Sequence, residues 1–113
     1  MRLRSDIVVS ALLRRVFSAG GFAAVEKRGA DQAGAIFIRH RFRDGTEDLY
    51  GPAPQMLAGE DGERAFERRL HRADPAEVEA LIARERRFDS DLWLVELETE
   101  TVDGLFAVVG ASA

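Results

Sequence analysis

The 113 residues of the chain include no cysteine. This absence excludes disulfide frameworks, thiolate nucleophiles and cysteine-based zinc sites together, and it fits a reducing compartment. A chain of this length can bury one hydrophobic core without disulfides or metals to reinforce it. Internal repeats, low-complexity tracts and linkers are absent as well, so nothing supports a second domain. We therefore expect a single domain over residues 1–113.

Long hydrophobic runs are also absent. The run from Ile7 to Leu13 follows two arginines, as in a secretion signal. However, Asp6 opens this run, Ser10 interrupts it, and no small-residue cleavage site follows at a suitable distance. Nothing approaches the roughly 18 apolar residues that a membrane span needs. We therefore expect a cytoplasmic protein without a membrane partner.

Familiar catalytic and cofactor-binding signatures are missing too. The sequence contains no phosphate-binding glycine loop, dinucleotide fingerprint, serine elbow or acetyl-carrier motif. Its two histidines, His40 and His71, lie on different predicted elements, and neither has a second histidine at a metal-ligand interval. We therefore expect no cofactor and no bound metal, and we place His40 at the edge of the core.

Charge is distributed unevenly along the chain. Residues 1–43 carry nine basic and three acidic side chains, whereas residues 44–113 carry seven basic and seventeen acidic ones. Such asymmetry can mark a nucleic-acid-binding end. Within one compact domain, however, the two halves can pair across a sheet, and we favour this interpretation.

Two helices are indicated by capping residues and apolar spacing. Ser5 or Asp6 can cap the first, whose apolar residues recur at intervals of three and four until Gly20 and Gly21 end it. Asp74 begins the second, because an aspartate followed by proline and an acidic first turn is typical of a helix start. Its buried face is marked by Val78, Leu81 and Ile82.

The most regular strand pattern runs from Ala33 to Phe42. Alternation between two faces is expected of a half-buried strand. One face carries Ile36, Ile38, His40 and Phe42, and the other carries Phe37, Arg39, Arg41 and Arg43. The Asp44-Gly45 pair then suits a two-residue turn. Such a turn would place Arg43 opposite Thr46, Arg41 opposite Asp48 and Arg39 opposite Tyr50.

Other strands have less regular patterns. A short strand is expected over 22–25, and residues 92–98 alternate like a strand that Asp103-Gly104 turns back into a last strand over 105–109. Prolines and glycines between residues 52 and 62 indicate a loop. The stretch 64–70 fits either a strand or a helix, and we favour a strand.

Together these elements predict an α+β fold, a mostly antiparallel sheet of about five to seven strands with two helices packed on one face. The apolar last strand would lie at a sheet edge, where it could pair with a second copy, so a homodimer stays open. The core is expected to contain Ile36, Ile38, Trp93, Val95 and Leu97 together with Leu12, Val16, Leu81 and Ile82.

Ionisable residues around the end of the second helix form the best candidate for a site. Glu85 follows Leu81 and Ile82 at helical spacing, which directs a carboxylate toward the core and requires an arginine partner. Carboxylates that converge here could bind a divalent metal or act as an acid–base pair. The alternative is a structural ion pair beside two turn aspartates, which we favour because no recognised metal-ligand spacing is present. The candidate residues are Arg84, Glu85, Arg87, Asp89, Asp91, Trp93 and Glu96.

A basic row on the long strand is a second candidate. Arg39, Arg41 and Arg43 could contact an anion such as nucleic-acid phosphate. An acidic row of Glu96, Glu98 and Glu100 alternates in the same way on a later strand. Pairing of the two rows across one sheet face would neutralise both. We therefore expect the opposite charges to cancel and do not expect nucleic-acid binding.

Several segments of the chain resemble one bacterial family. These segments are Ser10–Arg15, Gly20–Ala23, Ala33–Ile38, Tyr50–Pro52 and Arg84–Trp93. In them the sequence resembles the alphaproteobacterial domain-of-unknown-function family number 1491. The resemblance implies a short, stand-alone bacterial protein with one domain. It implies no activity, because the family has none assigned.

From these observations we predict a small non-catalytic binding or regulatory module with a protein partner. The competing hypothesis is a metal-dependent hydrolase or nuclease that uses the carboxylates of Glu85, Asp89 and Asp91. A structure separates the two hypotheses. Three or more carboxylates around one point would favour the enzyme, whereas Glu85 held against an arginine in a closed interior would remove it.

Overall fold

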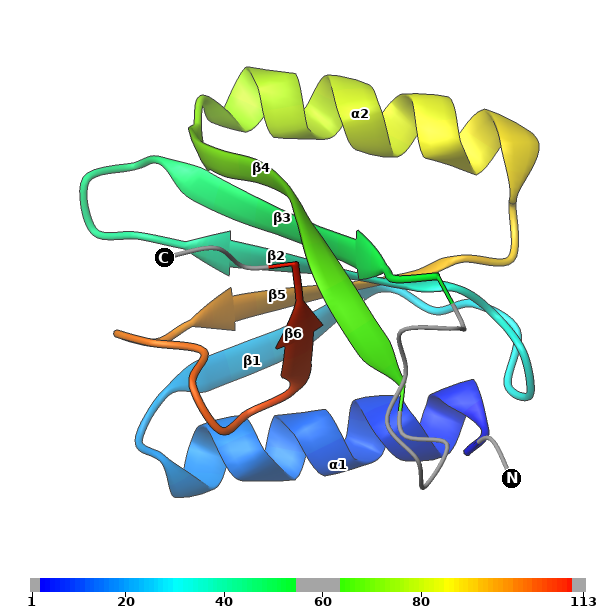
Figure 1. The fold of residues 1–113 in the computed structure, drawn as a ribbon, viewed down its shortest axis with the longest axis horizontal. Coiled ribbons are helices and arrows are strands. Elements are labelled where there is room, and N and C mark those ends of the chain that lie inside the picture. Colours follow the sequence, from blue (N-terminus) through cyan, green and yellow to red (C-terminus); the bar gives the residue numbers. More distant parts are fainter. Residues whose placement is uncertain (1–2, 55–63, 111–113) are drawn as a thin grey trace.

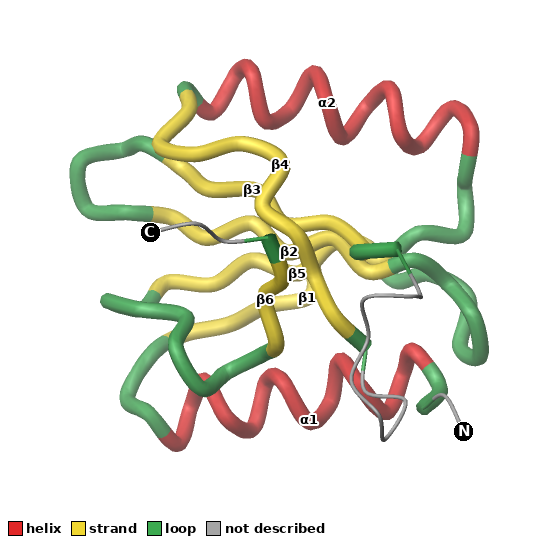
Figure 2. Tube along the Cα trace, in the orientation of Figure 1, coloured by secondary structure: helices red, strands yellow, loops and turns green. Residues whose placement is uncertain are grey.

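A six-stranded sheet lies between two helices in the computed structural model of the protein, which describes residues 3–54 and 64–110 (Figure 1). In chain order the elements are α1 (Ser5–Ser18), β1 (Phe22–Lys27), β2 (Ile36–Arg41), β3 (Glu47–Pro52), β4 (Ala65–Ala73), α2 (Pro75–Phe88), β5 (Trp93–Glu98) and β6 (Ala107–Val109). The two helices lie on opposite sides of the sheet (Figure 2). The prediction that both helices pack on one face is therefore wrong.

The strands lie side by side in the order β1-β5-β2-β3-β4-β6. The β2–β5 and β4–β6 pairs are parallel, whereas the other three neighbouring pairs are antiparallel. The sheet is therefore mixed, and not mostly antiparallel as predicted. The cause is a crossover: the chain leaves β2 through β3, β4 and α2 and returns as β5 on the other side of β2, running in the same direction.

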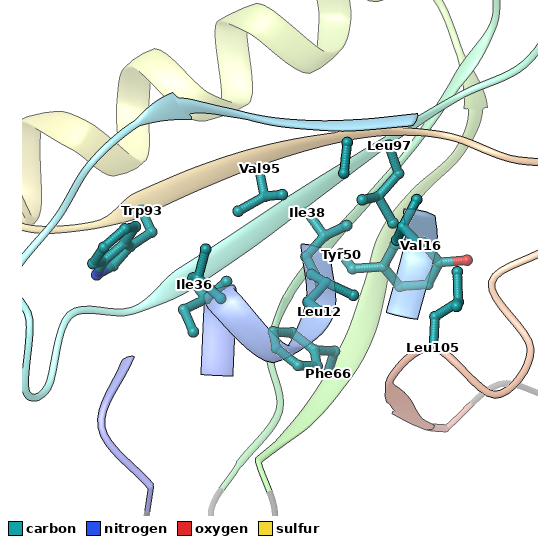
Figure 3. Packing of buried hydrophobic residues seen from close by; sticks show 12 residues of the cluster. Leu12, Val16, Ile36, Ile38, Tyr50, Phe66, Trp93, Val95, Leu97 and Leu105 are labelled. Atoms are coloured by element: carbon teal, nitrogen blue, oxygen red, sulfur yellow. The ribbon is translucent and has the colours of Figure 1, made fainter. Parts of the chain in front are cut away.

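Side chains from the two sheet faces form two cores, because successive residues of a strand point to opposite faces. The core under α1 includes Leu12, Val16, Ile36, Ile38, Trp93, Val95 and Leu97 (Figure 3). The core under α2 includes Phe37, Leu49, Val78, Ile82 and Leu94, with Leu81 at its margin. The predicted core residues therefore lie in hydrophobic clusters, but Leu81 and Ile82 belong to the second cluster and not to a single shared core.

The predicted capping residue begins α2 but not α1. α2 begins as predicted, because Asp74 Oδ1 accepts a hydrogen bond from Ala76 N at 3.0 Å. The N-cap of α1 is instead Arg4, which makes no side-chain cap hydrogen bond. Ser5 is buried, and its Oγ donates to Gly34 O at 2.6 Å. The Ser5 hydroxyl therefore ties α1 to the loop before β2 and does not cap the helix.

The β2–β3 hairpin has a three-residue loop and not the predicted two-residue turn. Phe42 N donates to Thr46 O at 3.0 Å, and Gly45 N donates to Phe42 O at 3.1 Å. Gly45 has φ 89°, a left-handed conformation that favours glycine. This is the geometry of a type I turn followed by a left-handed residue.

The extra loop residue shifts the predicted strand register by one. Arg41 pairs with Glu47, and His40 pairs with Asp48, whereas the sequence predicted Arg41 opposite Asp48. A shift of one residue changes the face on which partners meet. Glu47 therefore shares a face with the arginines of β2, while Asp48 shares the other face with His40.

β6, the last strand in the sequence, forms the edge of the sheet opposite to β1. The strand interpretation of 64–70 is confirmed by β4. The Asp103-Gly104 turn is present, with φ 79° at Gly104, but β6 then pairs with β4 and does not return along β5 as predicted. The predicted loop around Gly59 and Gly62 lies outside the described residues. Within the described ranges, no helix is long and apolar enough to cross a membrane.

Candidate functional site

Arg39 lies at the centre of a buried charge network on the α2 side of the sheet. Its side chain is 3% exposed and contacts Glu47 Oε1 at 2.7 Å, Glu26 Oε2 at 3.3 Å and Glu79 Oε1 at 2.6 Å. Burial opposes the charged form, but the hydrogen bonds with Glu47 and Glu79 outweigh it and raise the pKa of Arg39. The guanidinium is therefore fully engaged inside the protein.

Arg41 extends the same network toward β5. It contacts Glu47 Oε2 and Glu96 Oε1, each at 3.1 Å, and Glu26 Oε1 at 3.8 Å. Burial and a hydrogen bond with Glu26 raise the pKa of Glu96. Charge pairing across the sheet is thus present at Arg39 and Arg41, although most partners are Glu26 and Glu47 and not the predicted acidic row.

The third arginine of the predicted basic row behaves differently. Arg43 is exposed, and it makes no ion pair within residues 3–54 and 64–110. From the acidic row, only Glu96 contacts an arginine among the described residues. The predicted cancellation of charge is therefore present at Arg39 and Arg41 and absent at Arg43. Arg43 lies in the hairpin loop, beyond the end of β2.

The predicted site around the end of α2 does not converge on one point. Glu85 Oε1 lies 3.8 Å from Arg69 Nη1, with side chains that are 35% and 28% exposed. Asp89 Oδ1 accepts a hydrogen bond from Asp91 N at 3.0 Å, as a turn residue does. Trp93 is buried, and its Nε1 donates to Ala30 O at 2.8 Å. In the part of the chain that the structure describes, no three acidic or histidine side chains are grouped so that they could hold a metal.

The remaining candidates of this segment lie apart from one another. Arg84 and Arg87 are exposed on α2 and form no ion pair with a described residue. Glu96 belongs to the Arg41 network on β5. The segment therefore contains a structural ion pair at a surface, a turn and a buried tryptophan.

A cleft that the sequence did not predict lies where the β2–β3 hairpin turns. Its volume is about 950 Å³. The hairpin and the segment after β5 lie at the same end of the molecule (Figure 1), and both line the cleft. One side carries three arginines and one aspartate, and we call it the basic side; it consists of Arg41, Phe42, Arg43, Asp44 and Arg72. The acidic side consists of Glu98, Glu100 and Asp103.

Phe42 organises the basic side of this hairpin-end cleft. The Arg72 guanidinium carbon lies 3.6 Å from the centre of the Phe42 ring, and the His40 ring centre lies 4.4 Å from it. Arg72 Nη1 is also 3.4 Å from Asp44 Oδ2. Hydrogen bonds from Thr46 lower the pKa of Asp44. Arg72 of β4 and Asp44 of the hairpin loop are thus held beside the Phe42 ring.

The fold defines the class of this protein as a small α+β protein with a mixed sheet, a helix on each face and a cleft at the hairpin end. The chain belongs to the family described as protein of unknown function (DUF1491), which matches residues 3–107. The family resemblance in the sequence is thereby confirmed. No curated protein matches the chain.

Solved structures of relatives share the whole fold. The solution structure of protein Atu0922 from A. tumefaciens, a structural genomics target, has 58% sequence identity and a TM-score of 0.89, and the match covers 99% of this chain and 98% of that one. A crystal structure of a DUF1491 family protein from Caulobacter crescentus has 30% identity, a TM-score of 0.77 and coverage of 96% and 98%. A solution structure of a family protein from the same organism has 32% identity, a TM-score of 0.75 and coverage of 96% and 97%.

Proposed function

We propose that the protein is a non-catalytic binding or regulatory module, and that it binds a polypeptide segment of a partner protein in the hairpin-end cleft. The observation that carries this proposal is the opposite charge of the two sides of the cleft, with Phe42 on the basic side. A polypeptide can present acidic, basic and apolar groups together, so it can match both sides. We also propose that it acts as a single domain in the cytoplasm.

The positions of the charged side chains favour binding through this cleft over two competing functions, metal-dependent hydrolysis and nucleic-acid binding. The metal-dependent hydrolase or nuclease loses support because Glu85, Asp89 and Asp91 do not converge in the described structure. Nucleic-acid binding through the basic row loses support because Arg39 is enclosed by three carboxylates. Only the outer end of that row remains available to a ligand.

Charge reversal on each side of the cleft tests the proposal. Arg43→Glu and Glu100→Arg each change one exposed residue of the cleft, and Arg86→Glu changes an exposed residue of α2 as the matched control. Each protein is immobilised and exposed to a lysate of Agrobacterium tumefaciens, the source of a relative with 58% identity. We expect wild type and the control to retain the same polypeptide and both cleft variants to retain about tenfold less.

The salt dependence of capture provides a second readout. Contacts between exposed charges weaken as the ionic strength rises, so capture by wild type should decrease in high salt. Equal capture by wild type and both cleft variants would refute the cleft as the binding surface. Loss of capture by the α2 control alone would move the surface to that helix.

A further inference from the structure

The buried carboxylate of Asp48 is engaged at both oxygens. Asp48 is 3% exposed. Its Oδ1 accepts hydrogen bonds from Arg72 N at 2.7 Å and from His71 Nδ1 at 3.0 Å. Its Oδ2 lies 3.5 Å from Tyr50 OH and 3.9 Å from Arg68 Nη1. Because a buried carboxylate without donors is costly, these contacts fix the position of both the carboxylate and the imidazole.

His71 is held by this carboxylate at one ring nitrogen, which leaves the other available. An ionised carboxylate only accepts hydrogen bonds, so the shared hydrogen belongs to Nδ1. The lone pair of the neutral ring is then on Nε2. The His71 side chain is 56% exposed, and its Nε2 forms no hydrogen bond with a described residue. A carboxylate that orients an imidazole in this way is found beside histidines that act as bases or nucleophiles.

The backbone is distorted to build this pair. Arg72 has φ 49°, a left-handed conformation that is uncommon outside glycine. The β3–β4 register also shifts on both sides of Leu49. Strained backbone of this kind is concentrated at functional sites.

We propose that His71 is a phosphorylation site that accepts a phosphoryl group on Nε2. A cation at this pair, Arg68, favours this chemistry, because arginine is the preferred side chain for binding phosphate oxygens. Arg68 is 36% exposed, and its Nη1 lies 3.9 Å from Asp48 Oδ2, on the carboxylate that holds the His71 ring. Arg72 follows His71 in the sequence and is 49% exposed, but its guanidinium lies over Phe42 and 3.4 Å from Asp44 Oδ2. The proposal does not depend on the ligand of the hairpin-end cleft.

The bond changes balance with a phosphoryl donor of the phosphoramidate or acyl phosphate class. The Nε2 lone pair attacks phosphorus, the N–P bond forms, and the bond from phosphorus to the leaving group breaks with its electron pair. The hydrogen on Nδ1 stays in place, so the ring becomes a cation, which the Asp48 carboxylate offsets. The residue that follows His71, Arg72, lines the hairpin-end cleft, so the modification would add negative charge close in the chain to that surface.

Phosphoramidate, which transfers its phosphoryl group to imidazole and releases ammonia, is the probe for this test. The full chain is incubated with it at neutral pH, in parallel with His71→Asn, Asp48→Asn and a free peptide of residues 68–74. Intact-mass spectrometry follows the reaction, and phosphorus NMR identifies the nitrogen that is modified. We expect one acid-labile phosphoryl group on Nε2 of His71, formed about tenfold faster than on the peptide.

The variants separate an activated histidine from one that is merely exposed. His71→Asn keeps His40, which is 2% exposed, and should not be modified. Asp48→Asn should react at the rate of the peptide, and thermal unfolding shows whether this variant is folded. Equal rates for wild type and the peptide would overturn the proposal, whether or not Asp48→Asn folds. Modification of His71→Asn at the wild-type rate would overturn it as well.

Discussion

Replacement of Arg39 by methionine removes the buried cation of the network under α2 while keeping a long apolar side chain. The change leaves Glu26, Glu47 and Glu79 without their shared partner. Glu47 is the most affected of the three, because its side chain is 4% exposed. We expect a large loss of stability.

The structure sets the size of this loss. Removal of one partner of a buried ion pair costs about 3–5 kcal/mol. Glu79 is 62% exposed and can be hydrated, and Glu47 keeps Arg41 at 3.1 Å, so the lower end of the range applies. We therefore expect the free energy of unfolding to fall by about 3 kcal/mol. At about 4 °C per kcal/mol for a chain of this size, Tm should fall by about 12 °C.

Urea unfolding followed by far-ultraviolet circular dichroism measures this change. Arg43→Met is the matched control, because Arg43 is an exposed arginine in the hairpin loop that follows β2, and it should change stability by less than about 0.5 kcal/mol. Arg39→Met combined with Glu47→Gln should cost less than the sum of the two single variants, because the residues are in contact. An Arg39→Met variant as stable as Arg43→Met would refute the reasoning.

The remaining predictions concern the hairpin, a buried phenol and the last strand. Gly45→Ala should lower stability by about 1–2 kcal/mol, since Gly45 has φ 89°, and an unchanged urea midpoint would contradict the three-residue loop. Burial, and then the charge of Asp48, raise the pKa of Tyr50 above 10.0, so its contribution to stability is complete below that pH and is lost as the pH rises through the folded-state pKa. Wild type should therefore lose more stability than Tyr50→Phe between about pH 9 and 11, and equal losses would exclude this titration. Finally, pairing of two copies through the edge of β6 requires a dimer mass in light scattering, and a monomer mass at every protein concentration would rule it out.

Local sequence signals predicted most elements because they act within a few residues. The Asp74 cap marks the start of α2, and the alternation of β2 assigns its residues to the correct faces. The order of the strands was not predictable in this way. The insertion of β5 between β1 and β2 follows from a crossover through α2, and helix and strand patterns do not encode which strands become neighbours.

A one-residue error in the predicted β2–β3 register prevented prediction of the Asp48–His71 contact. The Asp44-Gly45 pair is compatible with both two-residue and three-residue loops. The shorter loop, which was predicted from the sequence, would place Asp48 opposite Arg41 as a pair of opposite charges. With Asp48 assigned to that pair, its contact with His71 was not predicted. Helical spacing did predict an arginine partner for Glu85, but the Arg69 pair is partly exposed, because α2 lies at the surface.

Site-specific photo-crosslinking in living Agrobacterium tumefaciens cells tests most directly whether the hairpin-end cleft is the binding surface. A photoreactive residue replaces either Arg43, which lines the cleft, or Arg86, which is exposed on α2. We predict a covalent adduct with a polypeptide from position 43 and none from position 86. An adduct from position 86 together with no adduct from position 43 would contradict the central claim.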